Sequence, residues 1–134
     1  MVQVTVTAAL KVAGGPTLPL SSTLQPQSYT FASVALNATG GAGDEQSVDL
    51  LPDGGTVVLL GVAAHTPGGK AAAVTLTPVN GTTEGEPFGI DGTLLIATPG
   101  VLAALVDGGP RSLKFANAGT ESVIVEVLTG LEPS

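Results

Sequence analysis

The sequence predicts an all-β fold in which short antiparallel strands form a sandwich, and three observations support this prediction. Residues that favour turns, mainly Gly, Pro, Asn and Asp, recur at intervals of about 8–14 residues along the chain. The segments between them are rich in Val, Thr and Ile, which are enriched in β-strands. None of these segments is both long and free of Gly and Pro, so a substantial helix has little room.

The alternation of apolar and polar side chains indicates where the strands lie. Near the N-terminus, Val2, Val4 and Val6 alternate with polar residues, which is the period of two of a strand. The clearest case is 121–128, where Val123, Val125 and Val127 face one way. The expected strands are 1–12, 17–20, 29–36, 46–51, 57–64, 70–79, 93–97, 101–106, 112–116 and 121–128. Because eight or more strands in this length favour a jelly roll over a seven-stranded immunoglobulin-like sandwich, we expect residues 1–134 to form a single jelly-roll-like domain of about 8–10 strands.

Two of these segments, 57–64 and 101–106, are apolar at every position. A strand in a two-layer sandwich normally exposes one face to water, so such a segment needs cover on its second face. The cover could be the loop 82–92, or the second segment could be a short buried helix, because Ala and Leu favour helices. Alternatively, both segments contact another protein. The candidate interface residues are Val57, Val58, Leu59, Leu60, Val62, Val101, Leu102, Leu105 and Val106.

Charged residues are scarce in this chain. They make up 11% of the residues, against roughly a quarter in an average soluble domain. Because surface charge keeps a monomer dispersed, we expect other protein to cover part of the surface. The formal net charge is −7 and the 4 basic residues are scattered, which argues against nucleic acid and anionic membranes as partners. No apolar stretch approaches the length of a membrane span, and the N-terminal segment lacks the pattern of a secretion signal.

No catalytic or metal-binding motif is present in the sequence. There is no cysteine, and the one histidine, His65, stands at the end of an apolar run without a G-x-S-x-G motif elsewhere. Asp44, Glu45, Asp49 and Asp53 lie close together in sequence but do not follow the spacing of a calcium loop. We therefore assign no catalytic residue, no cofactor and no metal ligand.

The loop 80–92 is one of the two longest expected loops, and long loops at the end of a sandwich often carry function. It suggests an alternative function, that of an adhesive or glycan-binding module. The absence of Trp weakens this alternative, because sugar sites use aromatic platforms. The candidate binding residues of this loop are Glu84, Glu86, Phe88, Ile90 and Asp91.

The C-terminal third of the chain reads IDGTLLIATPG and then RSLKFANAGTESVIVEVLTG, a strand, a short turn and a final Val-rich strand. With its few charges and many Thr, Ala, Gly and Val residues, the chain resembles the jelly-roll cement (decoration) proteins of tailed bacteriophages. The resemblance implies a structural protein without enzymatic activity. Such a protein bridges neighbouring subunits of the major capsid protein lattice, often as a dimer or trimer, and stabilises the shell. It implies synthesis in the host cytoplasm and a final location on the capsid surface of the virion.

Overall fold

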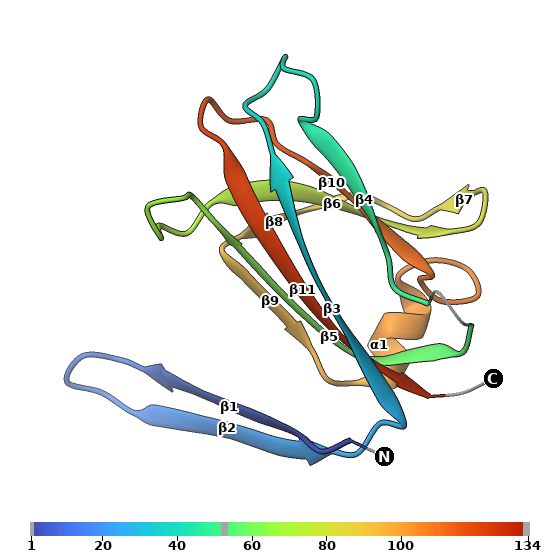
Figure 1. Cartoon of the computed structure of the whole chain (residues 1–134). Helices are drawn as coiled ribbons and strands as arrows, with labels where there is room; N and C mark the ends of the chain where they lie inside the picture. The colour runs from blue at the N-terminus through green and yellow to red at the C-terminus, as the bar shows by residue number, and fades with distance from the viewer. Residues whose placement is uncertain (1, 52–53, 133–134) are drawn as a thin grey trace.

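The computed structural model describes residues 2–51 and 54–132, and strands and turns make up nearly all of it (Figure 1). One short helix, α1 (Pro99–Ala104), is present in this part of the chain. The strands are β1 (Val4–Lys11), β2 (Thr17–Leu24), β3 (Ser28–Leu36), β4 (Glu45–Asp49), β5 (Thr56–His65), β6 (Ala73–Asn80), β7 (Thr83–Glu84), β8 (Phe88–Asp91), β9 (Thr93–Ile96), β10 (Ser112–Ala116) and β11 (Val123–Glu132).

The strands from β3 onwards form two antiparallel sheets. The β11 sheet has the order β3-β11-β5-β9, and the β10 sheet has the order β4-β10-β6, with β7 and β8 both pairing with β6. Core side chains fill the space between the two sheets. The predicted all-β sandwich is confirmed.

The pairing of the strands is that of a jelly roll. The pairs β3 with β11, β4 with β10, β5 with β9 and β6 with β8 are the rungs of one long antiparallel hairpin whose turn lies between β6 and β8. Rolling up this hairpin brings β10 beside β6 and β11 beside β5, which completes the two sheets.

The core follows the period of two that the sequence shows. In β11, Val123, Val125 and Val127 are buried, and the intervening residues lie on the other face of the sheet. From the β10 sheet, the fully buried Leu113 and Phe115 join the same core cluster. The alternation expected for 121–128 is therefore confirmed.

The segment 101–106 is not a strand but belongs to α1 and the turn that follows it. The helix begins at Pro99, a favourable first residue because its missing N–H would have no helical partner at that position. Leu102 is fully buried and Val106 is nearly so, whereas Val101 is 49% exposed. The expected strand is wrong here. The alternative of a short helix is confirmed, but this helix is buried only at Leu102 and its other residues are exposed. Figure 1 shows this helix at one end of the sandwich.

The other all-apolar segment is β5, which lies between β11 and β9 in its sheet. Its inner face contributes Leu60, Val62 and Ala64 to the core. On its outer face Leu59 is 1% exposed, and it lines a small space together with residues of β1. The outer face is therefore covered at Leu59, beside the stem of the N-terminal hairpin, whereas Ala63 on the same face is exposed.

Strands β1 and β2 form a two-stranded sheet of their own. Figure 1 shows this hairpin leaving one end of the sandwich and projecting away from it. The expectation was one sandwich over residues 1–134; instead, the sandwich begins at β3 and the hairpin stands apart. At its stem, the Val2 N–H donates to the Pro26 carbonyl (2.8 Å), and the Gln27 N–H donates to the Leu131 carbonyl (3.0 Å).

Candidate functional site

The hairpin of β1 and β2 is amphipathic. Residues directly opposite one another in an antiparallel pair point to the same face. The register places Ala8 opposite Leu20 and Leu10 opposite Leu18. One face carries one polar residue, Ser22, and the apolar residues Val4, Val6, Ala8, Leu10, Leu18, Leu20 and Leu24. The other face carries mainly Thr5, Thr7, Lys11, Thr17, Ser21 and Thr23.

The outer half of the apolar face is uncovered. Leu10 is 60% exposed, Leu18 53% and Leu20 44%, and Val12 at the turn is 61% exposed. Single exposed apolar residues are normal on a protein surface, but a contiguous set on one face marks an interaction site. A two-stranded hairpin is also only marginally stable in water when nothing packs against it. The hairpin therefore presents an apolar surface that the chain does not cover.

The stem of the hairpin is held against the outer face of the β11 sheet by close packing around Gly130. A Cβ atom at this position would lie 3.0 Å from the Cβ of Leu59 and 3.3 Å from the Cγ of Pro26. Gly130, Leu59 and Pro26 are all buried. Glycine at 130 thus allows the chain that enters β3 to lie directly on the sheet, which fixes the point from which the hairpin projects.

A shallow apolar groove of about 340 Å³ lies on the outer face of the β11 sheet. Its larger apolar lining side chains include Phe31 of β3, Leu95 of β9 and Leu128 of β11, and the small residues Gly61 and Ala63 of β5 lie between them. One charged side chain, that of Glu126, also lines the groove. We call this set the β11 groove. Phe31 is 58% exposed and Leu95 46% exposed, so the lining is open to contact.

The β11 groove continues towards the hairpin stem. An adjacent space of about 250 Å³ is lined by Val4, Thr5, Val6 and Thr7 of the hairpin and by Leu59 of β5. Val4 and Val6 are half-buried there, whereas Thr5 and Thr7 are exposed. Gly61, Leu95 and Leu128 line both spaces. The apolar face of the hairpin thus begins to cover the groove at the stem, and the rest of the groove remains open.

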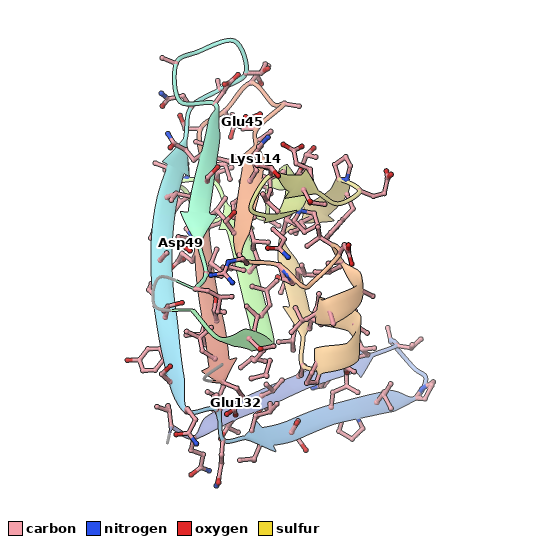
Figure 2. The ribbon with its side chains drawn as sticks, turned by 90° about the vertical axis from the view of Figure 1, so that its right-hand side faces the viewer. Glu45, Asp49, Lys114 and Glu132 are labelled. Carbon is pink, nitrogen blue, oxygen red and sulfur yellow. The ribbon has the colours of Figure 1, made fainter. Side chains whose placement is uncertain are left out.

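The outer face of the β10 sheet is polar in contrast. Figure 2 labels Glu45 and Asp49 along β4 and Lys114 on the neighbouring β10. The Nζ atom of Lys114 lies 2.9 Å from Oε2 of Glu84. The hydrogen bond to Glu84 raises the pKa of Lys114, and the charges of Glu84 and Glu45 act in the same direction. Of the two outer faces, the β11 sheet is therefore the one suited to apolar contact.

His65 lies near one end of the β11 groove, where it contacts Glu126. Its Nε2 is 2.8 Å from Oε1 of Glu126, and its Nδ1 is 3.0 Å from the carbonyl oxygen of Thr66. Both partners accept hydrogen bonds, so the imidazolium, which donates from both nitrogens, fits this site best. The hydrogen bond to Glu126, and then that to Thr66, raise the pKa of His65 above its ordinary value of 6.5. Neither contact provides an adjacent nucleophile.

Four of the five candidate loop residues lie in two short strands, and Glu86 lies in the segment between these strands. β7 and β8 both pair with β6. Ile90 is buried in the core, Phe88 packs against the core, and Glu84 is held by its ion pair. Glu86 and Asp91 remain exposed. The structure thus does not bring the five candidates together as one exposed binding surface.

Most of the candidate interface residues lie inside the chain. Val57, Leu59, Leu60, Val62, Leu102 and Val106 are at most 5% exposed. Val58 and Leu105 are half-buried, and only Val101 is exposed. The prediction that these segments contact another protein is wrong for the six buried residues. The physical reason is that the chain supplies its own cover: the opposite sheet, the hairpin stem and the turn after α1.

The hairpin, the main uncovered apolar surface, is not among the interface residues expected from the sequence. A signal was present, because alternating apolar residues flank the turn at Gly14, Gly15 and Pro16 on both sides. Gly14 has a φ of +72°, which suits this turn. The exposed apolar side chains of the β11 groove were missed as well, since nothing local distinguishes them from core residues.

A second cleft, of about 560 Å³, opens at the end of the sandwich near the turn that precedes β11. Asp91, Asn117 and Glu121 are among its lining residues. Asn117 is buried and stabilises the turn, because its Nδ2 donates to the carbonyls of Asn37 (3.0 Å) and Glu121 (2.7 Å). Within residues 2–51 and 54–132, no three His, Cys, Asp or Glu side chains form a group that could hold a metal ion. Asp53, one of the four neighbouring carboxylates in the sequence, lies outside the described residues.

Comparison of the chain with protein-family models, with curated proteins and with solved structures gives no match. The fold and the site themselves define the class: a jelly-roll sandwich with a projecting amphipathic hairpin and one apolar outer sheet face. In the part of the chain that the structure describes, no helix is long and apolar enough to cross a membrane.

Proposed function

We propose that this chain is a structural protein of a virion, a cement (decoration) protein that binds the lattice of the major capsid protein and stabilises the shell. The observation that carries this proposal is the hairpin of β1 and β2, whose apolar face the chain leaves open at Leu10, Leu18 and Leu20. An apolar arm that projects from a compact body is suited to joining neighbouring molecules. A role without enzymatic activity is part of the proposal.

The low charge of the chain supports the same role. Because 11% of the residues are charged, contacts with neighbouring proteins require little desolvation of ions. A regular lattice also multiplies weak contacts, since each molecule engages several neighbours at once. The final location of the protein is then the capsid surface.

Co-sedimentation with coat shells tests the proposal. Shells of the major capsid protein, taken from the genome that encodes this chain and assembled without it, are mixed with the purified protein. We expect saturable binding at a fixed ratio to the coat subunit and a higher temperature of shell disruption. A protein that stays in the supernatant at tens of micromolar, with shells that melt unchanged, contradicts the proposal.

The glycan-binding alternative is separated by a different measurement. Two of its five residues, Phe88 and Ile90, pack on the core, so the exposed part of the loop offers no aromatic platform. A glycan array read with and without a chelator should show no signal above background. A chelator-sensitive signal would support the alternative instead.

A further inference from the structure

We infer that the occupant of the β11 groove is the hairpin of a second copy of this chain, so that copies join by placing the apolar face of β1 and β2 on a neighbour's β11 sheet. The inference rests on the proposed function in one respect, that the hairpin is an assembly arm. It does not depend on the identity of the shell.

The first argument is that the open groove and the space beside the hairpin stem share lining residues. Within one chain, Val4–Thr7 of the hairpin border the same space as Leu59, and of these Val4 and Val6 are half-buried whereas Thr5 and Thr7 are exposed. Gly61, Leu95 and Leu128 line both this space beside the hairpin and the open groove. The open groove is therefore suited to the same kind of occupant, an apolar face of a two-stranded ribbon. The chain's own outer hairpin residues, Leu10 and Leu18, stay exposed, so they do not fill it.

The second argument is the exposed area. The chain exposes 7426 Å², whereas a compact monomer of this mass exposes about 6,400 Å² by the usual scaling of surface with mass. The excess, about 1,000 Å², is close to the roughly 800 Å² that each partner buries in a standard specific interface. The surplus surface is thus of the size that a stable contact between two copies needs.

The third argument is charge. Lys11 is the one charged residue between positions 1 and 27. Since the formal net charge of the chain is −7, the residues after the hairpin carry −8. Two such bodies repel each other, and a hairpin with a single positive charge is the part of each molecule that approaches a neighbouring body favourably. The polar outer face of the β10 sheet, with Glu45 and Asp49, lacks the apolar side chains that the hairpin would need.

Light scattering after size exclusion, without any coat protein, tests self-association. At tens of micromolar the wild-type protein should show a mass of at least two chains, each of 13.1 kDa. The double variant Leu10→Ser, Leu18→Ser should weaken association roughly tenfold or more per leucine, because each loses a buried apolar side chain. The matched control is Thr7→Ser, Thr17→Ser on the opposite face of the same hairpin, which should associate as the wild type does. Because all four side chains are exposed within the chain, both variants should unfold at the wild-type temperature once the protein is diluted below its association range.

Disulfide trapping tests which surface the hairpin contacts. Because the chain has no cysteine, only the introduced cysteines can form disulfides. A Leu18→Cys copy is mixed with a differently tagged Leu95→Cys or Phe31→Cys copy and oxidised. We expect the mixed disulfide between hairpin and groove to form at least tenfold faster than one between Leu18→Cys and Ser47→Cys on the polar sheet.

Three results would overturn the inference: a monomeric wild type, association that ignores Leu10 and Leu18, or trapping that favours hairpin to hairpin or is equal for Ser47→Cys. These outcomes are separate from failure of the proposed function. A protein that associates through the groove and yet ignores coat shells keeps the inference and loses the capsid role. A monomer that still binds shells contradicts the inference and supports the capsid role.

Discussion

The Nε2 atom of His65 lies 2.8 Å from Oε1 of Glu126, across adjacent strands of the β11 sheet. The Nδ1 atom faces the carbonyl of Thr66, so the ring meets a hydrogen-bond acceptor on each side. The protonated ring satisfies both contacts, which is why the pKa of His65 is raised in the folded protein. This pair makes folding sensitive to pH near neutrality.

The sign of this pH effect follows from the raised pKa. A group that binds its proton more tightly when folded contributes stability that is fully present below its unfolded pKa of about 6.5 and is lost as the pH rises through the folded pKa. We expect the urea midpoint of the wild type to fall between about pH 6 and pH 8. In Glu126→Gln this fall should shrink, because the neutral amide does not favour the imidazolium. An equal fall in the variant would contradict the role of the pair.

Thr129 of β11 points between the sheets and is fully buried. Its Oγ1 has no hydrogen-bond partner in the part of the chain that the structure describes. Since an unpaired buried polar group costs about 1–3 kcal/mol, Thr129→Val should raise the free energy of unfolding by about 1 kcal/mol. The matched control is Thr77→Val on the half-exposed outer face of β6, which should stay within about 0.5 kcal/mol of the wild type. Chemical denaturation of both variants measures the difference, and a loss of stability in Thr129→Val would show that the hydroxyl is satisfied.

Gly130 and Gly61 lie on the outer face of the same sheet, but they differ in the space around them. A Cβ at Gly130 would meet Leu59 at 3.0 Å and Pro26 at 3.3 Å, whereas a Cβ at Gly61 would meet its nearest neighbour, the Leu128 carbonyl, at 4.0 Å. We therefore expect Gly130→Ala to cost about 1–3 kcal/mol through overpacking. It should also speed proteolysis at the hairpin stem. Gly61→Ala should leave unfolding and proteolysis nearly unchanged, and similar behaviour of the two variants would refute the packing argument.

Leu102 and Val101 are neighbours in α1 with opposite surroundings. Leu102 is fully buried and Val101 is 49% exposed. Leu102→Ala should lower the free energy of unfolding by about 2–5 kcal/mol because it leaves a cavity in the core. Val101→Ala should change it by less than about 1 kcal/mol. Thermal unfolding of the two variants measures the difference. Equal small effects would contradict the assignment of Leu102 to the core.

Much of the fold could be predicted from the sequence. The alternation at 121–128 identifies β11 and its buried Val residues, because successive side chains of a strand point to opposite faces. The spacing of the turns identifies most of the remaining strands, and these strands indicate the sandwich. The short apolar run at 101–106 was assigned wrongly because periodicity cannot separate a buried strand from a buried helix over so few residues.

For the candidate site, the sequence predicts that a surface for protein contact exists but does not locate it. The low charge indicates that some surface is covered by protein, but not which surface. The segment 57–62 is apolar at every position and is mostly buried, whereas the hairpin alternates apolar with polar residues and its apolar face is open. An apolar run or an apolar face along the chain thus does not show by itself which of the two is covered.

The sequence by itself determined the strands, their inward faces and the shortage of charge, since these depend on side-chain alternation and composition along the chain. Only the tertiary structure decided that β1 and β2 form a separate hairpin, that Pro26 and Leu59 close over Gly130, and that Phe31, Leu95 and Leu128 meet around an open groove. The reason is physical: alternation is a property of neighbouring residues, whereas cover depends on which distant strands pair and on what lies above each face once they have done so.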